Sequence, residues 1–173
     1  MDRDGTLVED RGYVHRVEDY QPIPGAVDGL RLLGDAGFGI AVITNQSGIG
    51  RGIFTEREFS VFQRHLIDDF AARGVHIEAT YHCPHRPEAG CDCRKPGTEL
   101  LRRAEHELGA SLEESFVVGD KPSDIEMARL AGCRAVYVLS GHGARLRAEL
   151  PDDVPVAADL ADAARRILAT RPV

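Results

Sequence analysis

The chain has 173 residues, of which 43% are apolar and 28% charged, and this fits a single globular domain over residues 1–173. Its net charge of −7 argues against binding nucleic acid through bulk charge, and no apolar run reaches the roughly 18 residues of a transmembrane helix. Because no signal peptide is visible either, we expect a cytoplasmic protein that binds neither nucleic acid nor membranes.

Helix and strand patterns alternate along the chain. Residues 38–43 form a continuous apolar run, which is typical of a buried parallel strand. A capping-box pair, Thr55 and Glu58, precedes apolar residues at helical spacing. We expect helices at 24–37, 55–70, 98–108, 123–131 and 159–170, and strands at 38–43, 78–82, 115–118 and 134–139. This alternation predicts an α/β fold with a doubly wound, mainly parallel sheet of Rossmann-like type.

Polar residues follow the ends of these strands, where ligands bind in a doubly wound sheet. Thr44 comes after the first predicted strand and Asp120 after the third. Residues 2–6, with the sequence Asp-Arg-Asp-Gly-Thr, suit an acidic hook at the end of a further strand. Of its two carboxylates, Asp2 and Asp4, one can attack a phosphorus atom while the other handles the proton of the leaving group.

Four short motifs follow one another in chain order: 2–6, 44–46 (Thr-Asn-Gln), 94–96 (Arg-Lys-Pro) and 119–120 (Gly-Asp). Together they resemble the haloacid dehalogenase superfamily of aspartyl-phosphate phosphatases, and the resemblance covers nearly the whole chain. Any one motif could be only a turn or a helix start, but all four in order make that interpretation improbable.

The resemblance implies a role for each motif. Asp2 would be the nucleophile, and Asp4 would act first as acid and then as base. Mg²⁺ would be held by Asp2, Asp120 and the backbone carbonyl of Asp4, with Asp124 bracing the metal site. The transferring phosphoryl group would be bound by Thr44, the amide of Asn45, and Lys95.

The resemblance also implies a buried central strand of about five or six apolar residues ahead of Asp2. Only Met1 precedes Asp2 in the sequence given. We therefore expect the first central strand to be missing from this sequence, with a misplaced or trimmed start.

A loop rich in cysteine, at residues 83–93, carries a second candidate site. Cys83, His85, Cys91 and Cys93 offer four zinc ligands within eleven residues. Because four protein ligands would fill all positions of a tetrahedral zinc ion, they predict a structural zinc site. The bound metal would fix the position of the segment that carries Arg94 and Lys95. A disulfide is a weaker interpretation because a Cys-x-Cys pair is strained, and the C-x-x-C spacing of redox motifs is absent.

This loop, with residues 44–52 and 12–14, narrows the resemblance to the D-glycero-D-manno-heptose 1,7-bisphosphate phosphatase family. That family removes the 7-phosphate of its sugar substrate, so the expected partner is a phosphorylated sugar. We expect an open site without a large cap domain, and a monomer. The implied substrate-binding residues are Asp10, Arg11, Gly12, Tyr13, Thr44, Asn45, Gln46, Ser47, Arg94, Lys95 and Lys121.

Three alternatives stay open. Histidinol-phosphate phosphatases share the zinc loop, but their Thr-Asn-Gln motif is followed by a different sequence from residues 47–50 here. Polynucleotide 3′-phosphatases share a stretch like residues 44–52, but we would expect no such zinc loop and a more basic surface. The missing first strand also allows a zinc-stabilised pseudoenzyme, because a nucleophile on a frayed terminus would be poorly placed.

Overall fold

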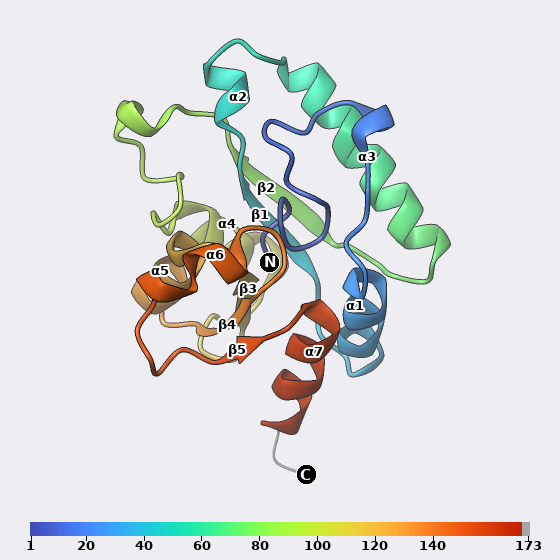
Figure 1. Ribbon diagram of the computed structural model, residues 1–173, viewed down its shortest axis with the longest axis vertical. Helices are drawn as coiled ribbons and strands as arrows, with labels where there is room; N and C mark the ends of the chain where they lie inside the picture. Colours follow the sequence, from blue (N-terminus) through green and yellow to red (C-terminus); the bar gives the residue numbers. More distant parts are fainter. Residues whose placement is uncertain (171–173) are drawn as a thin grey trace.

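The computed structural model describes residues 1–170, in which strands and helices alternate (Figure 1). The strands are β1 (Ala41–Asn45), β2 (Ala79–Cys83), β3 (Phe116–Gly119), β4 (Arg134–Val138) and β5 (Val156–Ala157). The α-helices are α1 (Ala26–Asp35), α2 (Ser47–Gly50), α3 (Glu56–Ala72), α4 (Glu99–Leu108), α5 (Pro122–Ala131), α6 (Gly143–Leu146) and α7 (Leu160–Ala169). Short 3-10 helices lie at Val17–Asp19, Pro87–Ala89 and Arg147–Glu149.

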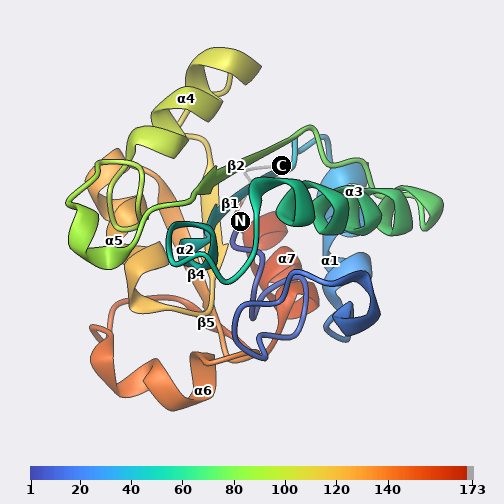
Figure 2. The same ribbon diagram turned by 90° about the horizontal axis from the view of Figure 1, so that it is seen from above.

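All the paired strands run parallel. β1 pairs with β2, while β3, β4 and β5 form a second sheet in that spatial order. Helices α1, α3 and α7 lie on one side of the strands, and α4 and α5 lie on the other (Figure 2). The expectation of a doubly wound parallel α/β fold is therefore confirmed, and no large cap domain is inserted within residues 1–170. No helix in this range is long and apolar enough to cross a membrane.

Most predicted elements are present, with shifted ends. The capping box of α3 is formed, since the Thr55 hydroxyl accepts from the Glu58 amide and the Glu58 carboxylate accepts from the Thr55 amide. The first predicted strand, 38–43, is observed three residues later as β1 because its pairing with β2 begins at Ala41. The sequence did not predict α2, α6 or β5, which are only two to four residues long and too short to show a hydrophobic period.

Met1 and Asp2 lie between the two sheets and hydrogen-bond to both. The amino group of Met1 donates to the carbonyl of Ala41 over 2.6 Å, and the amide of Ile43 donates to the carbonyl of Met1 over 2.9 Å. On the other side, the Asp2 amide donates to the Val118 carbonyl over 2.9 Å. This is the bonding pattern of a parallel ladder, so the two residues occupy the place of a strand end between β1 and β3.

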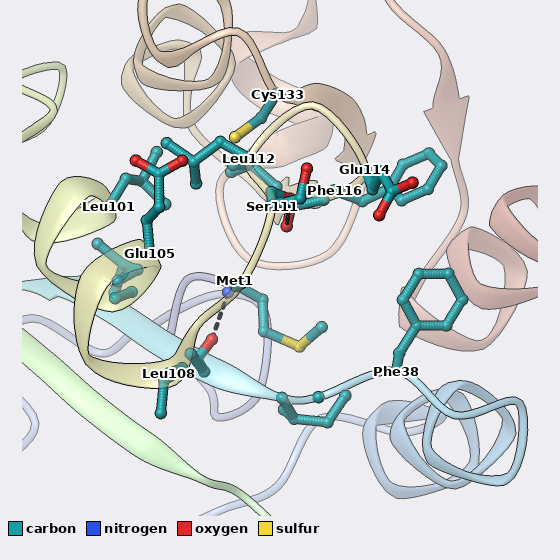
Figure 3. Close-up of a pocket in the computed structure, with 18 of the residues that line it drawn as sticks. Met1, Phe38, Leu101, Glu105, Leu108, Ser111, Leu112, Glu114, Phe116 and Cys133 are labelled. Carbon is teal, nitrogen blue, oxygen red and sulfur yellow. Dashed lines mark hydrogen bonds between the residues drawn. The ribbon is translucent and has the colours of Figure 1, made fainter.

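A cavity of about 420 Å³ lies behind Met1, between β1 and β3 (Figure 3). Many of its walls are apolar, including Leu101, Leu112 and Phe116. Among residues 1–170 no strand fills this position, in agreement with the expectation that the first central strand is absent from the sequence. The described chain thus leaves a cavity where its two sheets would otherwise join.

Candidate active site

The carboxyl ends of the strands meet at one polar pocket. It has a volume of about 420 Å³ and opens beside Asp2, Thr44 and Lys95. Twelve of the residues proposed from the sequence line it: Asp2, Asp4, Asp10, Gly12, Tyr13, Thr44, Asn45, Gln46, Ser47, Arg94, Lys95 and Lys121. Parallel strands explain this convergence, because their ends lie at the same edge although the motifs are far apart in sequence.

A buried lysine ties two carboxylates together at the bottom of the pocket. Lys95 Nζ lies 2.7 Å from Oδ1 of Asp2 and 2.6 Å from Oδ1 of Asp124. Burial opposes charge on all three groups, but the lysine holds the pKa of Asp2 below its ordinary value. Conversely, Asp124 and Asp2 outweigh burial and raise the pKa of Lys95. Asp2 is therefore an ionised carboxylate next to a fixed positive charge.

The segment that carries Lys95 is held by Asn45 at the end of β1. The Asn45 side chain accepts from the Lys95 amide over 3.0 Å and donates to the Lys95 carbonyl over 3.3 Å. The Lys95 ammonium also donates to the Ile43 carbonyl over 3.1 Å. These contacts fix the ammonium against the strand end that faces Asp2.

Asp120 stands next to Asp2 and is fully buried. Its Oδ2 accepts from the amide of His142 over 2.8 Å, while its Oδ1 has no hydrogen-bond partner among the described residues. Burial and the charge of Asp2 raise the pKa of Asp120 to about 8. Carboxylate oxygens of Asp2, Asp120 and Asp124 all lie within 4.8 Å of one another. A buried acidic cluster with a free oxygen suits a hard divalent cation such as Mg²⁺.

Gly5 allows the acidic hook to approach Asp120. A Cβ atom at Gly5 would lie 2.1 Å from Oδ2 of Asp120, and the residue has a φ of +90°. Both the space and the backbone conformation therefore require glycine.

Asp4 is held by Arg3, a residue that the sequence analysis did not select. The Arg3 side chain is 1% exposed and donates to the Asp4 carboxylate at 2.8 Å and 3.1 Å. Its guanidinium lies 4.8 Å from the centre of the Phe62 ring and 5.5 Å from that of Phe59, both on α3. Gln46 Nε2 donates to Oδ2 of Asp4 over 2.8 Å. The position of Arg3 between Asp2 and Asp4 could have indicated this role from the sequence. The burial of Arg3, however, depends on packing against α3.

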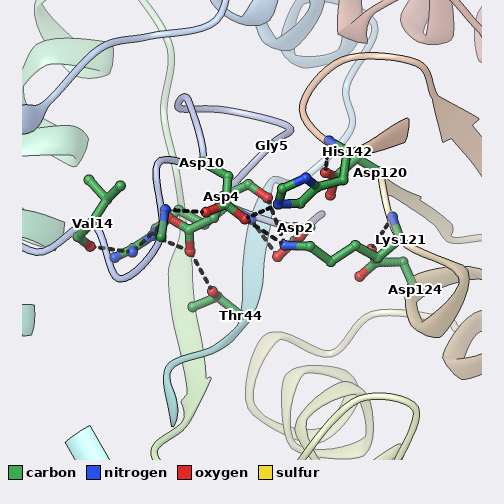
Figure 4. Close-up of polar contacts among 12 residues, drawn as sticks. Asp2, Asp4, Gly5, Asp10, Val14, Thr44, Asp120, Lys121, Asp124 and His142 are labelled. Carbon is green, nitrogen blue, oxygen red and sulfur yellow. Dashed lines mark hydrogen bonds and ion pairs between the residues drawn. The ribbon is translucent and has the colours of Figure 1, made fainter. Parts of the chain in front are cut away.

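Asp10 joins the loop at the pocket rim to two other segments (Figure 4). Its carboxylate accepts from Lys121 Nζ over 3.0 Å and from the Gly12 amide over 2.9 Å. His142 Nε2 lies 3.1 Å from the same oxygen that Lys121 contacts. His142 also lines the pocket, and the sequence analysis did not select it.

The four expected zinc ligands lie together at the end of β2, which Cys83 closes, and on the loop that follows it. The Sγ atom of Cys93 lies 3.1 Å from that of Cys83 and 3.5 Å from that of Cys91, and His85 Nδ1 lies 3.2 Å from the Cys93 sulfur. Ligands about 2.3 Å from a tetrahedral zinc ion would be about 3.8 Å apart. All four cysteines of the chain are free thiols, so no disulfide competes with metal binding. The set therefore has the donors and the spacing of a closed zinc site.

Known proteins resemble this chain in both sequence and structure. A protein of Photorhabdus laumondii named D-glycero-beta-D-manno-heptose-1,7-bisphosphate 7-phosphatase is 41% identical over 138 residues, covering 76% of this chain and 73% of that protein. A probable phosphatase of the same name from Thermoplasma volcanium is 45% identical over 130 residues, covering 75% of this chain and 89% of that protein. A HAD-hydrolase-like family model matches residues 92–163.

A solved structure matches the fold over almost its full length. It is the D,D-heptose 1.7-bisphosphate phosphatase from B. bronchiseptica complexed with magnesium and phosphate. Its TM-score is 0.91 at 31% identity, covering 98% of this chain and 97% of that one. The chain belongs to the heptose-1,7-bisphosphate phosphatase family. It is therefore a phosphoric monoester hydrolase with the haloacid dehalogenase fold, as the sequence motifs indicated.

One residue expected at the sugar of this family lies elsewhere. Arg11 does not line the pocket, and its guanidinium contacts the side-chain oxygen of Gln21. The neighbouring Asp10, Gly12 and Tyr13 do line it. The chain bends at residues 11–13, where Gly12 and Tyr13 both have positive φ, and Arg11 is exposed to solvent.

Proposed function

We propose that this phosphatase removes the 7-phosphate of D-glycero-D-manno-heptose 1,7-bisphosphate through an aspartyl-phosphate on Asp2. The observation that carries the proposal is the pairing of ionised Asp2 with buried Lys95 in a pocket that Asp4 also lines, with buried Asp120 next to Asp2. The relatives' names and the bound magnesium and phosphate of the B. bronchiseptica structure support it.

In the first half-reaction, an Asp2 carboxylate oxygen attacks the phosphorus and the bond from phosphorus to the sugar oxygen breaks. Lys95 and the Arg3 amide both donate to Oδ1 of Asp2, at 2.7 Å and 2.8 Å, which leaves Oδ2 as the attacking oxygen. Protonated Asp4 gives its proton to the leaving sugar oxygen. Thr44 and Lys95 stabilise the charge on the phosphoryl oxygens.

In the second half-reaction, water attacks the phosphorus of the acyl-phosphate. Asp4, now ionised, takes the proton from that water, and the bond from phosphorus to Asp2 breaks to release inorganic phosphate. Arg3 and Gln46 hold the Asp4 carboxylate beside the reacting group through both steps. The same two carboxylates therefore end in their starting states.

Mg²⁺ would be held by Asp2, Asp120 and the backbone carbonyl of Asp4, where it would reduce the repulsion between the nucleophile and the anionic substrate. The unpartnered Oδ1 of Asp120 supports this assignment. Asp124 would keep Lys95 in place through their 2.6 Å contact, as a bracing residue.

Zn²⁺ bound by Cys83, His85, Cys91 and Cys93 would have a structural role. Its loop leads directly into Arg94 and Lys95. Arg94 lines the pocket, and its buried Nη1 has no hydrogen-bond partner among the described residues. A guanidinium with a free buried donor suits a second phosphate on the substrate. A single phosphatase domain, a monomeric state and a cytoplasmic location remain predictions.

A phosphate-release panel tests the function. Its substrates are D-glycero-D-manno-heptose 1,7-bisphosphate, histidinol phosphate and a 3′-phosphorylated oligonucleotide. We expect the highest kcat/KM on the bisphosphate, release of one phosphate only, and no turnover by Asp2→Asn, because an amide cannot form the acyl-phosphate. A preference for either other substrate would refute the sugar assignment, and near-normal turnover by Asp2→Asn would refute the mechanism.

A further inference from the structure

The segment between β4 and α6 packs against the active site, although no sequence motif marks it. The Ser140 hydroxyl donates to the carbonyl of Gly5 over 2.8 Å, and the His142 amide donates to Asp120 over 2.8 Å. At Gly141 a Cβ atom would lie 2.3 Å from the Cα atom of Gly5. These contacts fix the backbone that carries the His142 side chain.

The imidazole of His142 has a carboxylate partner, Asp10 (Figure 4), and a guanidinium partner, Arg145. Nε2 is 3.1 Å from Oδ2 of Asp10, and Nδ1 is 3.2 Å from Nη2 of Arg145. An ionised carboxylate can only accept and a guanidinium can only donate. A neutral imidazole with its proton on Nε2 satisfies both partners, so His142 donates to Asp10 and accepts from Arg145.

Asp10 connects this histidine to the turn at the pocket rim. One of its oxygens accepts from both His142 and Lys121, and the other accepts from the Gly12 amide. The next residue, Tyr13, has a φ of 54° and is 46% exposed. A non-glycine residue in this region is strained by about 1–3 kcal/mol and persists when its surroundings hold it. The hydrogen bonds to Asp10 supply such support.

We propose that His142 is a positioning residue for the substrate: it holds Asp10, and through Asp10 the Gly12–Tyr13 turn, where the part of a sugar phosphate remote from the reacting phosphate binds. This inference rests on the proposed function and deepens it. The contacts of the imidazole go to Asp10 and Arg145 and not to Asp2. Its effect therefore concerns recognition of the sugar more than the phosphoryl transfer.

Two amide variants separate the contact with Asp10 from the mere presence of a side chain. In His142→Gln, an amide nitrogen lies three bonds from Cβ, as Nε2 does, and it can still donate to Asp10. In His142→Asn, the amide nitrogen lies two bonds from Cβ, as Nδ1 does, and it cannot reach the carboxylate. His142→Ala removes both contacts.

Steady-state kinetics on the parent and the three variants measure the effect on recognition. The substrates are heptose 1,7-bisphosphate and 4-nitrophenyl phosphate, which has no sugar. We expect the ratio of kcat/KM between them to fall about tenfold in His142→Asn and His142→Ala, mostly through KM, as expected for one hydrogen bond. In His142→Gln this ratio should stay near that of the parent.

Hydrogen exchange followed by mass spectrometry measures the positioning without any substrate. Amides of residues 9–14 should exchange several-fold faster in His142→Asn than in the parent, and at the parent rate in His142→Gln. Equal behaviour of the Asn and Gln variants in both measurements, or an equal loss on both substrates, would overturn the inference. If the parent failed to hydrolyse the bisphosphate but exchange differed as expected, the proposed function would fail and the positioning role would stand.

Discussion

At the scale of single residues, the candidate active site contains buried charged side chains that contact one another. Lys95 is 5% exposed and contacts both Asp2 and Asp124. Removal of one member of a buried ion pair leaves the other uncompensated, at a cost of about 3–5 kcal/mol. A variant of Lys95 would therefore change both the activity and the stability of the fold. A residue outside these ion pairs is a cleaner probe of activity alone.

Arg94 is such a probe, because its Nη1 makes no hydrogen bond within the described chain. If it binds the second phosphate of the substrate, Arg94→Ala should lower kcat/KM for heptose 1,7-bisphosphate by about 1.5–3 kcal/mol, the range for a hydrogen bond to a charged group. Loss on 4-nitrophenyl phosphate should be much smaller, since binding energy at the remote phosphate orients only the bisphosphate. Arg94→Lys keeps the positive charge but loses the planar guanidinium that can donate two parallel hydrogen bonds. Its kcat/KM for the bisphosphate should therefore lie between those of the parent and Arg94→Ala. An equal loss on both substrates would place Arg94 at the reacting phosphate instead.

The pKa of Asp120, raised to about 8 by burial and by Asp2, predicts a pH dependence for Mg²⁺ binding. If Mg²⁺ binds the ionised carboxylate of Asp120, as proposed, then binding below pH 8 must release a proton. We expect the dissociation constant of Mg²⁺ to fall as pH rises from 6 to 8, by up to about tenfold per pH unit, and then to level off.

Calorimetry in two buffers with different protonation enthalpies would measure this release near pH 7. Asp120→Asn has no titrating group at this position, so it serves as the control and should bind more weakly, with a flatter pH dependence. A constant affinity of the parent between pH 6 and 8 would contradict the assignment of Asp120 as a ligand.

At the scale of elements, the site depends on how strand ends and loops hold one another. Asn45, at the end of β1, clasps the backbone of Lys95 on the loop after β2, and the first residue past β3 is Asp120. The loop that carries Lys95 has little regular structure of its own apart from the Pro87–Ala89 turn. The conformation of this loop therefore depends on side chains that contact it, such as that of Asn45.

The protein purified without chelators should contain about one equivalent of zinc, because Cys83, His85, Cys91 and Cys93 offer four ligand atoms close together, as many as a tetrahedral zinc site needs. Elemental analysis measures the content. Cys91→Ser should lose most of the metal. Cys133→Ser is the matched control, because Cys133 is a buried cysteine of the same apolar cluster that does not belong to the group of four possible ligands. Metal-free protein from such a preparation would refute the zinc site.

At the scale of the whole molecule, two parallel sheets are joined through Met1 and Asp2. The amino group of Met1 is buried, and its pKa is lowered to about 6 by burial and by Lys95. Since the unfolded chain binds this proton more readily, the contribution of this group to stability falls as pH falls from 8 to 6. Asp2, the proposed nucleophile, therefore lies next to an amine with a lowered pKa and a cavity of about 420 Å³.

Five apolar residues added ahead of Met1 should continue the ladder between β1 and β3 and fill the cavity. The free energy gained by burying such side chains is slightly larger than the conformational-entropy cost of ordering them. We therefore expect the free energy of unfolding to rise by about 1–3 kcal/mol. Urea denaturation measures it. An extension of five Gly and Ser residues is the control for removal of the charged amine. Equal stability of the two extended chains would mean that the cavity does not accept a strand.

Several features of this protein followed from local sequence alone. The apolar run of β1, the capping box of α3 and the Cys/His spacing each depend on residues close together in the chain. The position of the pocket also followed, because parallel pairing brings strand ends such as Thr44 and Asp120 to one edge regardless of their separation. The resemblance of the motifs to a known family predicted phosphatase chemistry in this pocket.

Only the tertiary structure decided which side chains support those groups. Arg3 is buried because Phe59 and Phe62 of α3 pack over it, and His142 meets Asp10 across 132 positions of sequence. Arg11 lies outside the pocket and contacts Gln21, ten positions along the chain. Contacts of this kind depend on packing between distant elements, whose outcome no local pattern encodes, whereas hydrophobic period, caps and ligand spacing are set within a few residues.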